Sequence, residues 1–213
     1  MEADPMSLPA AARTLSDPSA PPGDAPAVAE ASLDGVLARA QRGELAAFRE
    51  LIRAHQDTVY TLALRMLKVP EDAEELAQDV FVSAHHSLGK ITSAAHLLFW
   101  LRRTVCHRAI DRLRRRPLHS SLPLDAVDEL PLPDPSGDPL LERHLRDLVL
   151  GLPPAPRAVL LLRYQEDLDP SEIATTLGMP LNTVKSHLKR SLASLRTGCD
   201  GFRQPPSADS SHD

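Results

Sequence analysis

Two proline-dense stretches decide which parts of this chain can fold. Residues 1–32 hold six prolines and residues 117–139, PLHSSLPLDAVDELPLPDPSGDP, hold six more. Proline has no backbone N–H and clashes with the preceding helical turn, so at this density it excludes both a helix and a central strand. We therefore expect a disordered N-terminal extension over 1–32 and an extended linker over 117–139. The tail, residues 199–213, is expected to fray.

Between these stretches lie two segments with helical periodicity, residues 33–116 and 140–198. We find no internal repeat and no convincing strand alternation in either. Four Phe, two Tyr and one Trp are the aromatic side chains, so the cores must pack through aliphatic residues. The predicted fold class is all-α, with two small helical domains joined by a Pro-rich acidic linker.

The net charge of −5 averages segments of opposite sign. Residues 33–116 carry 14 cations against 10 acids, a net of +4, and residues 140–198 carry eight against six, a net of +2. The linker has five acids and no cation, while 1–32 and 199–213 are also acidic. Two basic bodies separated by an acidic linker are compatible with a nucleic-acid partner.

The sequence argues against several other classes of protein. Cys106 and Cys199 lie far apart without a CxxC partner, so neither a disulfide framework nor a zinc site is predicted. The pair His85–His86 lacks the Cys or carboxylate spacing of a metal site, and we expect no metal and no cofactor. No apolar run approaches the ~20 residues of a membrane span. We expect a protein of a reducing cytoplasm without membrane insertion.

The segment 169–196, DPSEIATTLGMPLNTVKSHLKRSLASLR, indicates two short helices joined by a tight turn. Ser171 is a candidate N-cap of the first helix, and Gly178 permits the turn. Asn182 or Thr183 can cap the second helix. This arrangement predicts a helix-turn-helix.

The second of these helices is predicted to be amphipathic. Its core side repeats at helical spacing through Val184, Leu188, Leu192 and Leu195. Its outer face and flanks are polar and cationic, and consist of Thr183, Lys185, Ser186, His187, Lys189 and Arg190. Such a face can meet phosphates and base edges, which predicts a DNA recognition helix, with an ordinary amphipathic surface helix as the alternative.

Pro70 is expected to begin a helix with an acidic first turn. The face opposite its apolar stripe gathers Glu75, Gln78, Asp79, Val82 and His86. This face is either a docking surface for a protein partner or a solvated face.

A further helix is expected from Leu97 to Arg116, with the sole Trp of the chain on its polar side. Trp100 falls there with Arg103, Thr104, His107, Asp111 and Arg114. An indole among guanidinium groups can stack on unpaired bases. Alternatively, Trp100 packs under the preceding loop, 89–95, and caps the core.

Taken in order, these segments resemble the extracytoplasmic-function (ECF) group of bacterial sigma factors. The resemblance is carried by DAEELAQDVF (72–81), WL (100–101), the Asp-Arg-Leu-Arg run (111–114), PRAVLLLRYQEDLDPSEIATTLG (156–178) and TVKSHLKR (183–190). It implies that residues 33–116 are region 2, which binds core RNA polymerase and recognises and melts the −10 element. Residues 140–198 would be region 4, which reads the −35 element. The implied partners are core RNA polymerase and promoter DNA, and we expect an anti-sigma factor as a third.

The resemblance and the helix faces assign three sets of residues. The polymerase-binding set, carried over by position, is Asp72, Glu75, Leu76, Gln78, Asp79 and Phe81. The −10 set is Trp100, His107, Asp111, Arg112, Arg114 and Arg115 by position, with Arg103 from the shared face. The −35 set is Thr183, Lys185, Ser186, His187, Lys189 and Arg190 by position, with Ser171 and Asn182 from the capping pattern. His107 stands where the family commonly has Asn, and His187 replaces a common Arg.

Other functions remain as alternatives. TVKSHLKR also resembles the helix-turn-helix of response regulators, which would require a receiver domain of alternating strands and helices. A helical binding adaptor without DNA contact is a second alternative. The chain lacks GxxxxGK, GxSxG and HExxH, so we expect neither an enzyme nor a small-molecule substrate.

Overall fold

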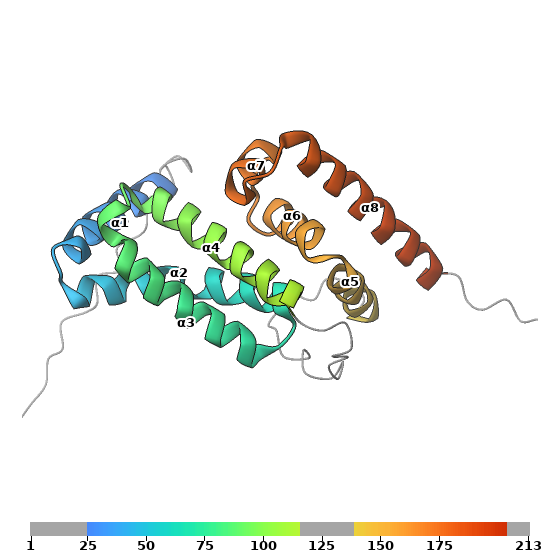
Figure 1. Cartoon of the computed structure of the whole chain (residues 1–213), viewed down its shortest axis with the longest axis horizontal. Helices are drawn as coiled ribbons and strands as arrows, with labels where there is room; N and C mark the ends of the chain where they lie inside the picture. The colour runs from blue at the N-terminus through green and yellow to red at the C-terminus, as the bar shows by residue number, and fades with distance from the viewer. Residues whose placement is uncertain (1–24, 116–138, 204–213) are drawn as a thin grey trace, which may run out of the picture.

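The computed structural model describes residues 25–115 and 139–203, and every regular element in these ranges is a helix (Figure 1). The first range contains α1 (Ala25–Gln41), α2 (Leu45–Leu67), α3 (Pro70–Ser87), the short 3-10 helix η1 (Leu88–Lys90) and α4 (Ala94–Arg115). The second contains α5 (Pro139–Gly151), α6 (Pro154–Tyr164), α7 (Pro170–Leu177) and α8 (Leu181–Arg203). The prediction of an all-α fold is therefore confirmed.

Proline begins several of these helices, as the sequence predicts for Pro70. α3, α6 and α7 each carry a proline in the first turn, where the missing N–H has no helical partner to lose. Glu71 and Asp72 follow in the first turn of α3 and suit its positive end.

Three helices are longer than expected. α1 begins at Ala25 rather than near Leu33, within a stretch whose alanines favour a helix once Pro26 lies in the first turn. α4 begins at Ala94 rather than Leu97, because the Ser93 hydroxyl accepts a hydrogen bond from His96 N (3.0 Å) and starts the helix earlier. α8 continues to Arg203, beyond the expected end at 198. The rest of the expected extension, linker and tail lies outside the described residues.

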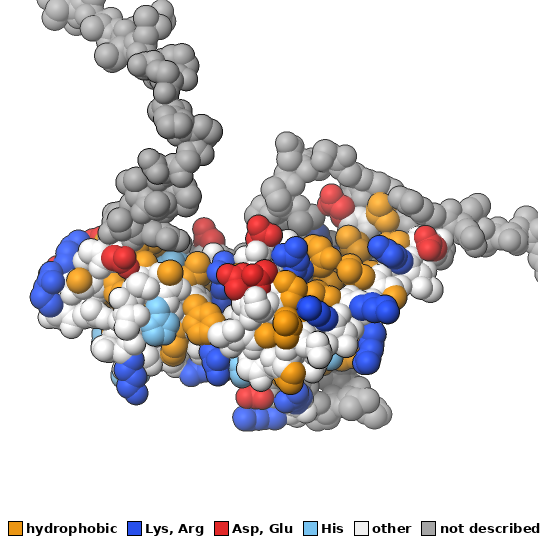
Figure 2. All heavy atoms as spheres, turned by 90° about the horizontal axis from the view of Figure 1, so that it is seen from above, with side chains coloured by type: hydrophobic (Ala, Val, Ile, Leu, Met, Phe, Trp, Pro, Cys, Tyr) orange, Lys and Arg blue, Asp and Glu red, His pale blue; other side chains and the backbone are white. Residues whose placement is uncertain are grey.

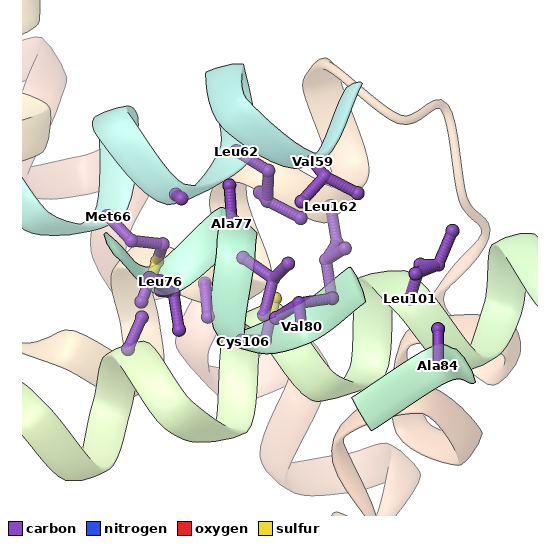
Figure 3. Packing of buried hydrophobic residues seen from close by; sticks show 14 of the residues in the cluster. Val59, Leu62, Met66, Leu76, Ala77, Val80, Ala84, Leu101, Cys106 and Leu162 are labelled. Atoms are coloured by element: carbon purple, nitrogen blue, oxygen red, sulfur yellow. The ribbon is translucent and has the colours of Figure 1, made fainter. Parts of the chain in front are cut away.

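The two helical units, α1–α4 and α5–α8, pack against each other. α6 and α7 lie along α4, and α6 also contacts α2 (Figure 1). One hydrophobic cluster contains buried residues of both units, and Leu162 of α6 lies in it with Val59 and Leu62 of α2 (Figure 3). Cys106 of α4 is fully buried in the same cluster, where burial raises the pKa of its thiol to about 12.

Polar contacts also join the two units. Arg102 of α4 forms an ion pair with Glu166 at 2.7 Å, and both side chains are largely shielded from solvent. Arg157 is 5% exposed and donates to the carbonyl of Met66 in α2 (2.5 Å) and to those of Leu150 and Leu152. These carbonyls lie at the C-terminal ends of α2 and α5, where helix dipoles favour a cation. Burial lowers the pKa of Arg157 to about 10.

Among the described residues, no helix combines the length and apolarity that a membrane span requires.

Candidate nucleic-acid interface and partner-docking face

The first helix of the predicted helix-turn-helix starts from Asp169. The Oδ1 atom of Asp169 accepts hydrogen bonds from the backbone N–H groups of Ser171 (2.7 Å) and Glu172 (2.9 Å). In return, Oε2 of Glu172 accepts a hydrogen bond from the backbone N–H of Asp169 (2.7 Å). This capping box corrects the assignment of Ser171 as N-cap: with Pro170 in the first turn, the cap must precede it. Ser171 Oγ instead donates to Asp169 Oδ1 (2.6 Å) and contributes most to holding the pKa of that carboxyl below its ordinary value.

The turn between α7 and α8 is made at Gly178, in the left-handed region with φ 63° and ψ 35°. Its N–H donates to Ala174 O, which ends α7. α8 begins at Leu181, and the N–H groups of Thr183 and Val184 reach Pro180 O. Asn182 and Thr183 thus lie inside the first turn, and their assignment as caps is wrong. The helix-turn-helix itself is confirmed.

The outer face of α8 is cationic, as predicted. Val184 and Leu195 are buried, and Leu188 and Leu192 are half-buried on the same side. The exposed polar side chains are Asn182, Lys185, Ser186, Lys189 and Arg190, with Thr183 and His187 half-buried beside them. Figure 2 shows Lys and Arg side chains spread around hydrophobic ones on the half of the molecule that carries α8.

The cations of α8 differ from several of those of α4 in having no acidic side chain of the described residues paired with them. Within 25–115 and 139–203, no carboxylate forms an ion pair with Lys185, Lys189 or Arg190. Their positive charge is therefore available to an external anion such as a phosphate.

The predicted −10 residues of α4 differ in how far contacts within the protein already use their side chains. Trp100 is half-buried and packs against the hydrophobic cluster, as the core-capping alternative requires. Arg103 Nη1 donates to Thr175 O of α7 at 3.2 Å. The remaining exposed members of the set are His107, Asp111, Arg114 and Arg115.

Arg112 links the predicted −10 set to the predicted polymerase-binding set. Its Nη1 lies 3.2 Å from Glu75 Oε2 and its Nη2 lies 2.8 Å from Asp79 Oδ2. Arg108 adds a hydrogen bond to Ser83 Oγ (2.6 Å) and a longer contact with Asp79. The acidic face of α3 and the basic face of α4 therefore share one ion-pair network, which helical periodicity alone could not reveal.

The polymerase-binding set on α3 divides into surface and core. Leu76 is 0% exposed, which corrects its assignment as a contact residue: it lies on the apolar stripe and packs inward. Phe81 is half-buried against the hydrophobic cluster. Glu75, Gln78 and Asp79 are exposed, and Val82 between them is 58% exposed. An exposed valine among acids and an amide suits a protein partner.

Sequence reasoning missed four side chains that position these surfaces. They are Asp34 and Gln41 of α1, which hold the loop before α4, and Arg157 and Glu166, which join the two units. Each acts across a large separation in the chain, and helical periodicity carries no signal for such partners.

A helix-turn-helix with an exposed cationic face, attached to a helical unit with one acidic and one basic face, is typical of a DNA-binding protein. Family models for "Sigma-70 region 2" and "Sigma-70, region 4" match residues 51–117 and 143–195, respectively. The RNA polymerase sigma-E factor of Streptomyces avermitilis is 34% identical over 159 residues, which cover 72% of this chain and 86% of that protein. The ECF RNA polymerase sigma factor SigM of Mycobacterium tuberculosis is 31% identical, with 75% and 81% covered.

The chain belongs to the ECF group of the sigma-70 family. It is an alternative sigma factor that directs transcription initiation. The response-regulator alternative requires a receiver domain ahead of the helix-turn-helix. In this chain, residues 51–117 match sigma region 2 instead.

Solved structures share the fold. CnrH in complex with the cytosolic domain of CnrY has a TM-score of 0.58 and 24% identity, covering 79% of this chain and 98% of that one. The Bartonella quintana sigma factor RpoE, in complex with the anti-sigma factor NepR, also has a TM-score of 0.58, with 17% identity and coverage of 73% and 98%.

Proposed function

We propose a division of labour among the helices of this sigma factor. α3 docks on core RNA polymerase, α4 and the loop before it recognise and melt the −10 element, and α8 reads the −35 element. The observation that carries this proposal is the set of exposed cations on α8, which have no carboxylate partner among the described residues and extend from a capped helix-turn-helix. A protein acting with RNA polymerase would work in the bacterial cytoplasm.

The domain limits follow from the same division. We assign residues 33–116 to region 2 and 140–198 to region 4, with α1 and the end of α8 extending these units beyond the periodic segments. An anti-sigma factor is a further proposed partner, supported by the Bartonella quintana relative of known structure, which was solved with one.

The docking role of α3 is tested by Gln78→Arg. Gln78 is exposed and makes no side-chain hydrogen bond within the described residues, so the change places a cation on the acidic face without breaking the Arg112 network. We expect co-purification with core polymerase to weaken by roughly tenfold or more, as for a central interface residue, with helical content unchanged. A gel shift on promoter DNA should fail in parallel, because we expect tight binding to require polymerase.

Gln56→Arg is the matched control, since Gln56 is an exposed glutamine on α2. It should leave co-purification unchanged. If the Gln78 variant binds core polymerase as the wild type does, α3 is not the docking helix.

The melting role of α4 is tested by Trp100→Ala. Base stacking on an aromatic ring is worth roughly 1–3 kcal/mol, so its loss should slow open-complex formation about tenfold or more. Permanganate reactivity of thymines near the start site measures opening, and a premelted bubble template should restore most of the activity. A fall in melting temperature without rescue by the bubble would instead assign Trp100 wholly to the core.

A further inference from the structure

The loop between α3 and α4, residues 88–93, is held by side chains from α1. Gln41 Nε2 donates to two carbonyls of the loop, Leu88 O at 2.9 Å and Ile91 O at 2.8 Å. Asp34 Oδ1 accepts from Ala94 N at 2.5 Å, where α4 begins. These contacts join residues that are 47 to 60 positions apart in the sequence. α1 therefore holds a loop that lies far from it along the chain.

Two backbone N–H groups of the loop also have nearby acceptors. Ile91 N donates to Leu88 O at 3.1 Å, and Thr92 N donates to Nδ1 of His96 at 3.2 Å. Leu88 and Ile91 are buried, at 6% and 3% exposed, and anchor the loop at two points. The exposed residues between and beside these anchors are Gly89, Lys90 and Thr92. A short exposed surface therefore rests on a fixed backbone.

Gln41 lies next to a tight turn that an ion pair spans. It is the last residue of α1, and the chain then turns through Gly43, whose φ of 92° favours glycine. Arg39 Nε pairs with Glu44 Oε2 across this turn at 2.9 Å. From this position, the side-chain NH2 group of Gln41 donates one hydrogen to each of the two loop carbonyls.

We propose that Gln41 and Asp34 are positioning residues that preorganise the loop 88–93 to capture an unpaired base of the −10 element. This inference rests on the proposed function of region 2. A binding loop that is already ordered loses less conformational entropy when it takes up its ligand than one that must order on binding. Both residues lie outside the part of the chain that matches region 2, residues 51–117, and neither needs to contact DNA.

The decisive variant is Gln41→Met, which keeps the side-chain length but removes both donors without adding charge. The probe is a single-stranded DNA pool, randomised over a short central stretch, that is retained by the full-length chain bound to core polymerase and then sequenced. We expect enrichment of the preferred base at one position to fall about five- to tenfold, the effect of losing one to two hydrogen bonds. Binding to core polymerase should be unchanged. Gln56→Met, at an exposed glutamine of α2, is the control and should keep the wild-type preference.

Asp34 supplies a conservative rescue. Asp34→Ala removes the acceptor of Ala94 N and should lower the base preference, whereas Asp34→Asn retains an acceptor oxygen and should preserve it. Unchanged selection by a folded Gln41→Met variant would overturn the inference, as would an equal weakening of core binding and base selection. A wild-type complex that selects no base would overturn the proposed function of the loop, and this inference with it.

Discussion

Replacing Leu162 with alanine is expected to lower the free energy of unfolding by about 2–5 kcal/mol. Leu162 is 0% exposed and belongs to α6, yet it packs in the cluster that contains Val59 and Leu62 of α2 (Figure 3). The cavity would therefore open between the two helical units rather than inside one of them. For a chain of this size, the melting temperature should fall by roughly 5–15 °C, and chemical denaturation gives the free energy.

The shared cluster also sets how the variant unfolds. Because α2, α4 and α6 bury residues in one core, we expect both units to unfold in a single transition that moves as a whole. Leu45→Ala is the matched control: Leu45 is 57% exposed at the start of α2, and its loss should change stability by no more than about 0.5 kcal/mol. Separate melting of α5–α8 with α1–α4 unaffected would show that the two units do not share a core in solution.

Periodicity and capping signals allowed most of the helices to be predicted. Pro70 marked the start of α3, Gly178 marked the turn of the helix-turn-helix, and the buried side of α8 followed from the spacing of its leucines and valine. The helix ends were harder to predict, because Asp169 and Ser171 are both good caps and the position of Pro170 decides between them.

Contacts between distant helices could not be predicted in this way. The Arg102–Glu166 pair, the Arg157 bonds to Met66 O and the Gln41 bonds to the loop all join residues far apart in sequence. A single sequence contains no signal that pairs such residues. The prediction for Leu76 failed for a related reason: transfer from the family motif ignored the apolar stripe on which it lies.

The second large effect that we expect is on promoter binding, when cationic side chains of α8 are removed. Lys185, Lys189 and Arg190 are exposed and in no ion pair with the other described residues, so their removal changes DNA contacts without releasing an internal partner. Arg112 of α4 differs, because its loss would also unpair Glu75 and Asp79. Binding defects of α8 variants can therefore be read as changes in the interface with DNA.

Lys189→Ala should weaken binding of the polymerase complex to every promoter tested and lower the slope of log K against log salt by about one unit, because a lysine at a phosphate releases one counterion. Arg190→Ala should instead cost ~1–3 kcal/mol at one base-pair position of the −35 element, as for a bidentate contact with a base. Binding titrations across a set of single-base promoter variants and several salt concentrations measure both effects.

Arg196→Ala, an exposed cation later on α8, is the control and should leave the base preference unchanged. Equal losses for the Lys189 and Arg190 variants on every sequence would contradict this division, and would mean that both side chains contact phosphates.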